Sequence, residues 1–218
     1  MIKNITIDGP SGSGKSTIAK AISRDLGITY LDTGAMYRGV GYYAVSKGID
    51  PADEKKVLQI LDDIEMDIVY KKGEQRIIIC NEDVTPYIRE HNISMAASTV
   101  SKIPAVRIKL VELQRKIAER TDCVIDGRDI GSYVLPKAKY KFFMTASAEE
   151  RAKRRHKELI EKGKNLTLNE VLDDIKKRDL QDSTRSFAPL VVPDGAYEID
   201  TTNMTVSEVI NYIKEIIC

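Results

Sequence analysis

The stretch from Gly9 to Ser16, GPSGSGKS, constrains the fold more than any other part of this sequence. It fits the pattern of a glycine, four residues and then Gly-Lys-Ser, which is typical of a phosphate-binding loop. Ile2, Ile5 and Ile7 before it favour a strand, and residues 16–26 carry apolar side chains at helical spacing. A loop between a strand and a helix is the context that this motif requires. We therefore predict a nucleoside triphosphate site; the alternative is a Gly/Ser turn that fits the pattern by chance.

Each part of the loop has a chemical role toward a triphosphate. Glycines let successive backbone N–H groups face one concavity, and the N-terminus of the following helix adds partial positive charge there. Lys15 is expected to reach the β- and γ-phosphates, and the Ser16 hydroxyl to ligate magnesium. The predicted ATP contacts span the whole loop: Gly9, Pro10, Ser11, Gly12, Ser13, Gly14, Lys15, Ser16 and Thr17. The motif does not identify the acceptor of the phosphoryl group.

The charge balance limits the partners of the chain. Its 218 residues include 34 basic and 33 acidic side chains, for a net charge of +1. A protein dedicated to DNA or RNA shows a basic excess, so this balance argues against a nucleic-acid partner. A small anionic substrate needs only a few local arginines. The length suits one α/β domain with insertions.

Cysteine usage and hydropathy predict a cytoplasmic protein. The cysteines are far apart and lack a C-x-x-C pair, which argues against disulfides or zinc and fits a reducing compartment: Cys80, Cys123 and Cys218. No apolar run approaches the roughly 18 residues that span a membrane, and the first residues suit a core strand rather than a signal peptide. No heptad or surplus apolar stripe is present, so we expect a monomer.

Strands and helices alternate along most of the chain. We expect strands at 2–7, 28–31, 123–126, 141–144 and 197–200. We expect helices at 15–26, 35–48, 53–62, from Pro104 onward, and at 148–161, 168–182 and 206–216, the last three after capping boxes. This alternation predicts an α/β fold, a P-loop-type parallel sheet with helices on both faces.

A different pattern fills residues 62–97. Two runs of strand character, 65–70 and 75–80, flank a turn and predict a hairpin. Residues 81–83 favour a second turn, and Thr85-Pro86 favours the start of a short helix. These signals predict a small inserted subdomain that interrupts the core. The expected bounds are a P-loop core at 1–61 and 98–218, an inserted subdomain at 62–97 and a lid segment at 154–170.

Two strand ends carry groups suited to an acceptor, because ligands of open α/β sheets bind beyond the carboxyl ends of the strands. Arg38 lies about one helical turn beyond Asp32 and can hold a phosphate; the alternative is a simple turn with a surface arginine. The other end, Asp126–Gly131, combines two acids and an arginine between glycines, which a solvated turn rarely needs. There Arg128 can bridge phosphates, Asp129 can accept from a base amine, and Asp126 stands where such folds keep an acid near magnesium.

Clustered arginines mark one predicted helix. Arg151, Arg154 and Arg155 share a face of it. This suits a lid that closes over the transferred phosphoryl group and excludes water. A solvated face that nearby glutamates balance is the alternative.

A second arginine pattern lies further along. Arg178, Asp182 and Arg185 share one face if their helix continues that far. Two interpretations stand equally: Asp182 pairs with both arginines, or the three side chains grip a ribose and a phosphate.

Seven segments, taken in order, resemble bacterial cytidylate kinases. They are GPSGSGKST, LDTGAMYR, VTPYIR, the run from AAS-x-V to P-x-VR that ends at Arg107, IDGRDIG, ERAKRR, and RDLQDSTR with APL. The resemblance covers nearly the whole chain, and DTGAMYR with DGRDIG is far more specific than the phosphate loop. Thr33 stands where the family often has serine and keeps the hydroxyl.

This resemblance implies an enzyme that transfers the γ-phosphoryl group of ATP to CMP or dCMP, with Mg²⁺ bound alongside ATP. Its catalytic groups would be Lys15, Arg128, Arg154 and Arg155. The implied CMP-binding roles are Thr33, Arg107 and Asp129 for cytosine, with Ser98 in the same pocket; Arg38 and Arg128 for the acceptor phosphate; and Arg178, Asp182 and Arg185 for the ribose and nearby phosphate oxygens.

Two other functions stay open at this point. One is a kinase for another small acceptor, such as UMP, dTMP or shikimate, that shares the phosphate loop. The other is a nucleotide-dependent switch or an RNA-binding module that uses the arginine-rich helix, against which the balanced charge argues.

Overall fold

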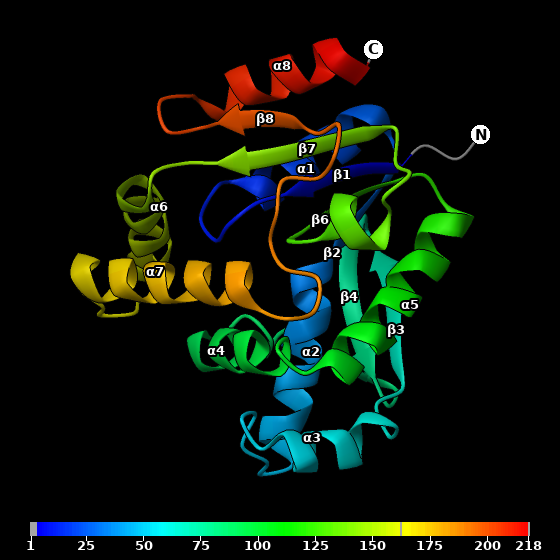
Figure 1. The fold of residues 1–218 in the computed structure, drawn as a ribbon. Helices are drawn as coiled ribbons and strands as arrows, with labels where there is room; N and C mark the ends of the chain where they lie inside the picture. Colours follow the sequence, from blue (N-terminus) through cyan, green and yellow to red (C-terminus); the bar gives the residue numbers. More distant parts are fainter. Residues whose placement is uncertain (1–3, 162, 218) are drawn as a thin grey trace. The chain divides into compact units, whose positions relative to one another are not determined.

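The computed structural model describes residues 4–161 and 163–217. Its larger sheet has the strand order β2-β6-β1-β7-β8, with β1 parallel to β6 and β7, and β7 parallel to β8 (Figure 1). A smaller antiparallel sheet has the order β3-β4-β5. The strands are β1 (Asn4–Asp8), β2 (Thr29–Asp32), β3 (Met66–Lys71), β4 (Glu74–Ile79), β5 (Glu82–Asp83), β6 (Cys123–Gly127), β7 (Tyr140–Thr145) and β8 (Tyr197–Asp200).

Helices surround these strands, and the predicted α/β class with a parallel sheet is confirmed. The helices are α1 (Lys15–Leu26), α2 (Thr33–Ser46), α3 (Glu54–Leu61), α4 (His91–Val100), α5 (Pro104–Arg120), α6 (Ala148–Glu161), α7 (Leu168–Thr184) and α8 (Val206–Ile217), and a π-helical turn, η1, covers Ile130–Val134. Within the described ranges, no helix is both long and apolar enough to cross a bilayer.

The chain packs as two compact units. Unit 1 comprises Met1–Tyr30 and Thr121–Cys218, and unit 2 comprises Leu31–Arg120. This division by packing does not coincide with the predicted insertion at 62–97, whose bounds as a nucleoside-monophosphate subdomain stay a prediction. Parts of some predictions lie outside the described residues: Ile2 and Lys3 of the first strand, Lys162 of the lid segment, and Cys218.

Unit 1 is organised by its parallel strands. β1 lies between β6 and β7, and its apolar residues Ile5 and Ile7 are fully buried, as expected for a strand covered on both faces. Helices α1 and α8 contribute Ile22 and Ile213 to the same apolar cluster. Parallel strands end at one edge of a sheet, so the loops that leave β1, β6 and β7 begin side by side. This edge positions the phosphate loop.

Unit 2 combines a hairpin with helices. β3 and β4 pair from Met66 with Ile79 to Lys71 with Glu74, which confirms the predicted hairpin. Gly39 on α2 permits close packing, because a Cβ atom there would lie 3.0 to 3.2 Å from side-chain atoms of the hairpin. The hairpin therefore packs directly on α2.

Two local predictions in unit 2 are wrong. The segment predicted as a turn at 81–83 contains the short strand β5, and the turn lies one residue earlier, at Cys80 and Asn81, both with positive φ. The helix predicted at Thr85-Pro86 does not form; instead the Thr85 hydroxyl accepts a hydrogen bond from the Ile77 N–H, which anchors this segment to β4. The helix comes later, as α4, which the sequence analysis did not predict.

The helix starts follow their capping residues. α2 begins at Thr33 rather than 35, because the Asp32 carboxylate caps it. The boxes that begin at Thr167 and Thr205 are complete, with reciprocal side-chain and backbone bonds to the glutamate three residues later. Ser147 caps α6 through the Glu150 N–H.

Candidate active site

The phosphate loop follows β1 directly and leads into α1. Gly9 has φ +143°, and a Cβ atom there would lie 1.9 Å from the carbonyl oxygen of Met144, so only glycine fits. Lys15 donates from Nζ to the carbonyl oxygen of Pro10 at 2.6 Å. The Ser13 hydroxyl donates to the same carbonyl at 3.1 Å. The loop therefore closes around the Lys15 ammonium.

Lys15 lies in an unusual electrostatic setting. It is only 5% exposed. Burial, and then the charge of Arg128, lower its pKa well below the usual value for lysine. Gly14 caps α1 without a side-chain hydrogen bond, so no capping side chain offsets the partial positive charge of this helix N-terminus. Such a setting suits the phosphates of a nucleotide.

Ser16 and Asp126 meet although 110 positions separate them in the chain. Ser16 donates from Oγ to Oδ2 of Asp126 at 2.6 Å, and the Tyr30 hydroxyl donates to Oδ1 at 2.9 Å. A hydroxyl and a carboxylate are hard oxygen ligands of the kind that magnesium prefers. In the described ranges, no group of three or more His, Cys, Asp or Glu could hold a metal. The Ser16 hydroxyl and the Asp126 carboxylate fit an ion held by one or two protein oxygens together with nucleotide phosphates.

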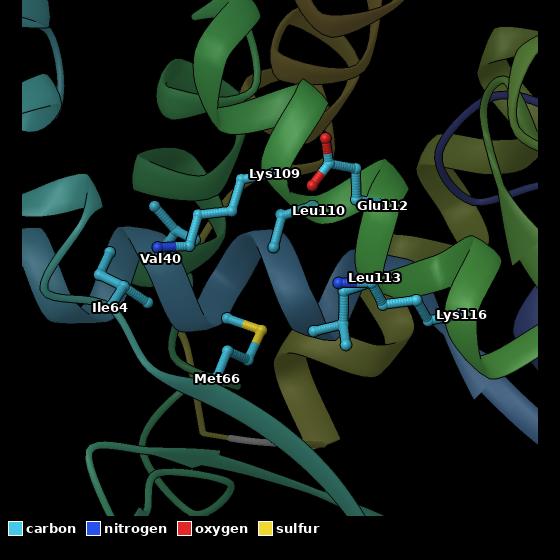
Figure 2. A pocket seen from close by; sticks show the side chains of 8 residues that line it. All are labelled: Val40, Ile64, Met66, Lys109, Leu110, Glu112, Leu113 and Lys116. Atoms are coloured by element: carbon cyan, nitrogen blue, oxygen red, sulfur yellow. The ribbon is translucent and has the colours of Figure 1, made fainter.

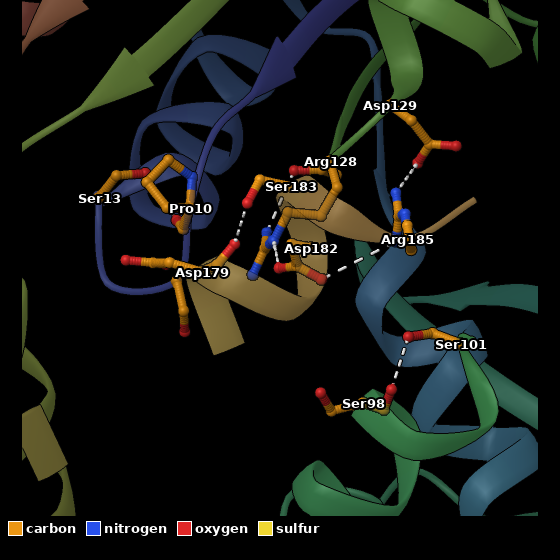
Figure 3. Close-up of polar contacts among 12 residues, drawn as sticks. Pro10, Ser13, Ser98, Ser101, Arg128, Asp129, Asp179, Asp182, Ser183 and Arg185 are labelled. Carbon is orange, nitrogen blue, oxygen red and sulfur yellow. Dashed lines mark hydrogen bonds and ion pairs between the residues drawn. The ribbon is translucent and has the colours of Figure 1, made fainter. Parts of the chain in front are cut away.

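A chain of ion pairs joins four residues that were predicted to bind the acceptor. Figure 3 shows that Asp182 lies between Arg128 and Arg185, at 2.9 Å and 3.8 Å, and that Arg185 lies 3.5 Å from Asp129. Burial opposes ionisation of Asp182, but the charges of Arg128, Arg178 and Arg185 lower its pKa. α7 ends one residue before Arg185, yet the pairing persists. The predicted pair of Asp182 with Arg185 is thus observed, whereas its pair with Arg128 was not predicted, and Arg178 acts on Asp182 through its charge.

Asp8 is a residue that the sequence analysis missed. It ends β1 directly before Gly9 and is fully buried. Its Oδ1 accepts from the Ile130 N–H at 2.8 Å, and its Oδ2 accepts from the Gly131 N–H at 2.7 Å. Burial raises the pKa of Asp8 to about 7. The signal available in the sequence was an acid at the end of an otherwise apolar strand.

Arg151 has a structural partner. Its guanidinium forms a bidentate ion pair with Asp179 on α7, at 3.1 and 2.6 Å. It also donates to the carbonyl oxygens of Ser11 in the phosphate loop and Ala146 before α6. Arg151 therefore ties α6 and α7 to the phosphate loop, a role that the shared helical face did not reveal.

The other two arginines of α6 point to different partners. Arg154 donates to the hydroxyl and carbonyl oxygens of Thr201, whose hydroxyl also lies 3.3 Å from the carbonyl oxygen of Ser13. Arg155 pairs with the exposed Glu158 at 3.0 Å. Arg154 is thus connected to the phosphate loop through Thr201, whereas Arg155 lies in a pair on the helix surface.

Unit 2 holds the segment that follows β2. The Asp32 carboxylate accepts from the Ala35 N–H and from Nη2 of Arg38, both at 2.8 Å. Burial opposes ionisation of Asp32, but the Arg38 guanidinium leads the groups that lower its pKa. Thr33 is buried at the first turn of α2. Arg38 is therefore a positioned side chain rather than a surface arginine on a simple turn.

Gln75 of the hairpin contacts the same segment, which the sequence analysis did not anticipate. Its Oε1 accepts from the Asp32 N–H at 2.7 Å, and its Nε2 donates to the Asp32 carbonyl oxygen at 3.2 Å. The amide thus satisfies both backbone groups of one residue, as a neighbouring strand would. The hairpin thereby fixes the backbone directly before Thr33.

Ser98 and Arg107 are brought together in unit 2 through Ser101. The Ser101 hydroxyl donates to the Ser98 carbonyl oxygen at 2.8 Å (Figure 3), and the Ser101 carbonyl oxygen accepts from Nη1 of Arg107 at 3.3 Å. Arg107 is 1% exposed and stacks over the ring of Tyr37.

The predicted site residues fall into two sets. Those of unit 1 are residues 9–17, Asp126, Arg128, Asp129, Arg154, Arg155, Arg178, Asp182 and Arg185, and those of unit 2 are Thr33, Arg38, Ser98 and Arg107.

A pocket of about 210 Å³ also lies in unit 2, between α2, β3 and α5 (Figure 2). Its lining includes the apolar residues Val40, Ile64 and Met66 and the basic residues Lys109 and Lys116. None of the residues that line it belongs to the predicted nucleotide-binding sets. This pocket is separate from the residues to which sequence and geometry assign phosphate chemistry.

The chemistry that unit 1 supports is phosphate binding and charge neutralisation. The charge of Arg128 contributes to the lowered pKa of Lys15, and Ser16 with Asp126 supplies hard oxygens. Phosphoryl transfer demands this combination of positioned cations and a metal, because charge builds up on the transferred group.

The comparisons with known proteins agree with this chemistry. A family model described as cytidylate kinase matches residues 5–218. The cytidylate kinase of Caldicellulosiruptor saccharolyticus is 48% identical over 213 residues, which cover 98% of this chain and 94% of that protein. The cytidylate kinase of Halalkalibacterium halodurans is 48% identical with 97% of each chain covered, and that of Clostridioides difficile is 49% identical with 96% and 95% covered.

Among solved structures, the shikimate kinase of Bacteroides thetaiotaomicron aligns with 100% of this chain and 99% of its own at 12% identity and a TM-score of 0.49, too distant to bear on function. The full-length family match carries more weight, because it includes the phosphate loop together with both acceptor-side strand ends. The chain therefore belongs to the cytidylate kinase family.

Proposed function

We propose that this chain makes CDP or dCDP by transferring the γ-phosphoryl group of ATP to CMP or dCMP. The chain is an ATP-dependent phosphotransferase of the cytidylate kinase family. The observation that carries the proposal is that Arg128, whose guanidinium pairs with Asp182, lies near Lys15 of the phosphate loop, in a chain that matches the family over residues 5–218.

ATP is assigned to residues 9–17. The loop backbone and the N-terminus of α1 would hold the phosphates, and Lys15 would exchange its contact with the Pro10 carbonyl for the β- and γ-phosphates. Ser16 would ligate magnesium, with Asp126 accepting from its hydroxyl or from a bound water. When bound there, magnesium supplies neutralisation of phosphate charge during transfer.

The acceptor is assigned by residue type. Asp129 would accept from the exocyclic amine of cytosine, with Thr33, Ser98 and Arg107 as further base-reading groups. Uracil carries a carbonyl oxygen in place of that amine, so the Asp129 carboxylate would face an acceptor instead of a donor. Asp129 is 4% exposed, which makes such a mismatch costly.

The acceptor phosphate is assigned to Arg38 and Arg128, and the ribose with nearby phosphate oxygens to Arg178, Asp182 and Arg185. Arg38 and Arg128 each have a carboxylate partner, Asp32 and Asp182, that holds the guanidinium in place. The acceptor oxygen is already anionic, so no general base is needed. Catalysis then consists of positioning and charge stabilisation.

The remaining assignments concern the lid arginines, the compartment, the oligomeric state and the partners. Arg154 and Arg155 would stabilise the transferred group from a lid at 154–170, and the contact of Arg154 with Thr201 near the loop supports this for Arg154. We assign the protein to the cytoplasm as a monomer without a nucleic-acid partner. The free thiols of Cys80 and Cys123 and the net charge of +1 support this.

The test is a panel of acceptors in a coupled assay of ADP release, with CMP, dCMP, UMP, dTMP and shikimate. We expect CMP and dCMP to give the highest kcat/KM. Asp129→Ala should reduce the preference for CMP over UMP by at least tenfold, while the exposed Asp67→Ala in β3 leaves that preference unchanged.

Other outcomes of the panel would identify the alternatives. Faster turnover of UMP, dTMP or shikimate than of CMP would replace the proposal with another small-acceptor kinase. Tight RNA binding with no acceptor-dependent ADP release would favour a nucleotide-dependent RNA-binding module.

A further inference from the structure

Asp8 is a fully buried carboxylate with no role in the reaction as described so far. It is the last residue of β1, and the ATP-binding loop begins at the next position. Burying a carboxylate is costly unless its oxygens are well satisfied. Asp8 lies at the sheet edge from which the phosphate loop and the segment with Arg128 and Asp129 both leave. A buried carboxylate at this place therefore points to a role in the site.

The partners of Asp8 lie on the acceptor side. In the parallel ladder Asp8 pairs with Gly127, the last residue of β6. The chain then leaves the sheet through Arg128 and Asp129 and returns at Ile130 and Gly131. The N–H groups of these last two residues point at the two oxygens of Asp8, at 2.8 and 2.7 Å. The carboxylate therefore holds the far end of the segment that carries Arg128 and Asp129 against the end of β1.

A neutral side chain could not make this contact equally well. An asparagine offers one acceptor oxygen, and its amide nitrogen would face the second N–H group, donor against donor. A carboxylate accepts from both N–H groups, and hydrogen bonds to a charged acceptor are shorter and stronger than neutral ones. These N–H groups belong to the first two residues of the π-helical turn η1, so the contact also holds the start of that turn against β1.

We propose that Asp8 is a positioning residue for acceptor recognition: its carboxylate fixes the segment from Gly127 to Gly131, the excursion, and so places Arg128 and Asp129 for CMP. This inference rests on the acceptor-binding roles proposed above for those two residues. Burial raises the pKa of Asp8 to about 7, which sets the conditions of the test.

The test compares Asp8→Asn with wild type at pH 8, where the wild-type carboxyl is ionised. We expect KM for CMP to rise at least tenfold and the preference for CMP over UMP to fall, with KM for ATP changed less than twofold. Amide hydrogen exchange at Ile130 and Gly131 should accelerate. Asp8→Ser, which keeps one acceptor oxygen and removes the buried charge, is the second variant if Asp8→Asn does not fold.

Two controls separate positioning from general damage. Ile7→Val trims the core on the same strand without touching the excursion, and should leave both KM values within twofold of wild type. A KM for CMP within twofold of wild type in the folded Asp8 variant would overturn the inference, as would equal losses for ATP and CMP. Asp129→Ala is measured alongside: if it too leaves CMP preference unchanged, the assigned role of the excursion fails, whereas a loss there with none at Asp8 removes only the inference about Asp8.

Discussion

Lys15 shows how a single residue links the fold to the reaction. Its ammonium is buried, and its recorded partners are the carbonyl oxygen of Pro10 and the hydroxyl of Ser13, both uncharged. Burial and the nearby guanidinium of Arg128 lower its pKa, so an anionic phosphate is the partner that would best stabilise its charged form. The residue is therefore prepared for a ligand rather than for the stability of the free protein.

Replacement of Lys15 by alanine should separate catalysis from folding. We expect kcat to fall by roughly a thousandfold, which corresponds to about 4 kcal/mol of transition-state stabilisation. The melting temperature should not fall, because the substitution removes a buried charge. The measurements are ADP release and thermal unfolding, with Lys20→Ala, an exposed lysine on the same helix, as the control. A kcat near the wild-type value would remove Lys15 from catalysis.

Asp8 makes a residue-scale prediction about stability and pH. Its pKa in the folded protein is about 7, against 3.8 as the ordinary value. At pH values between these two pKa values, the folded state binds more protons than the unfolded state. The contribution of Asp8 to the free energy of unfolding therefore rises as the pH falls from 8 toward 4. Relative to Asp8→Asn, the wild type should gain roughly 2 to 3 kcal/mol of unfolding free energy between pH 8 and pH 5.

Urea unfolding of both proteins at the two pH values measures this difference. The comparison with Asp8→Asn cancels the titration of groups that both proteins share. A difference between them that does not change with pH would show that Asp8 keeps an ordinary carboxyl pKa in the fold.

At the scale of elements, the Arg151 side chain links α6 to α7 and to the phosphate loop. Arg151 is 5% exposed, forms a bidentate pair with Asp179 and also donates to two backbone carbonyl oxygens. The adjacent turns of α6 and α7 share a small apolar cluster that includes Leu159 and Ile175. α6 and α7 therefore pack on each other (Figure 1), and the Arg151 side chain links this pair to the phosphate loop through the Ser11 carbonyl oxygen.

We expect substitutions of Arg151 and Arg155 to have unequal effects on the free energy of unfolding. Arg151→Ala should lower the free energy of unfolding by about 3 to 5 kcal/mol, because it breaks a buried pair and leaves carbonyl acceptors unsatisfied. Arg155→Ala removes an exposed i,i+3 pair with Glu158 and should cost less than about 1 kcal/mol. Urea denaturation of the two variants provides the comparison. Similar losses for both would show that the Arg151 contact contributes no more than a surface pair.

At the scale of the whole molecule, the two units carry different parts of the chemistry. Unit 1 contains the ATP loop and the cluster around Asp182, and unit 2 contains the segment from Thr33 to Arg38 with Ser98 and Arg107. A nucleotide that binds only the folded chain raises its free energy of unfolding by RT ln(1 + [L]/Kd), where [L] is the concentration of free nucleotide. Ligand-dependent stability therefore reports acceptor choice without turnover.

CMP at about a hundred times its dissociation constant should add about 2.7 kcal/mol to the unfolding free energy. For a chain of this length that corresponds to a rise in melting temperature of roughly 5 to 10 °C. UMP at the same concentration should give a smaller rise, and Asp129→Ala should bring the two nucleotides closer together. Equal shifts for CMP and UMP with the wild-type protein would contradict base recognition.

Much of the fold could be predicted because its signals are local. Capping residues set the starts of α6, α7 and α8, and the periodicity of apolar residues located β1, α1 and the hairpin. The errors arose where a local signal met a tertiary contact. Thr85-Pro86 favours a helix start, but the Thr85 hydroxyl bonds to the backbone of β4 instead.

The candidate site also combines features that local spacing predicts with contacts that only the tertiary structure shows. Glycines and Lys15 identify a phosphate loop by spacing alone, because the backbone of a tight loop is determined by adjacent residues. The sequence could not show that Asp8 contacts Gly131 or that Gln75 pairs with Asp32, since spacing does not say which distant side chains meet.

The sequence by itself thus determined the chemistry: a triphosphate loop, arginines for phosphates and an acid for a base. Only the tertiary structure decided which of these groups are held in place and by what. It turned Arg151 from a predicted lid arginine into a contact between α6, α7 and the loop, and placed the Asp8 carboxylate against the N–H groups of Ile130 and Gly131. The physical reason is that charge placement depends on burial and on partners far apart in the chain, and both arise only when the strands of the parallel sheet align.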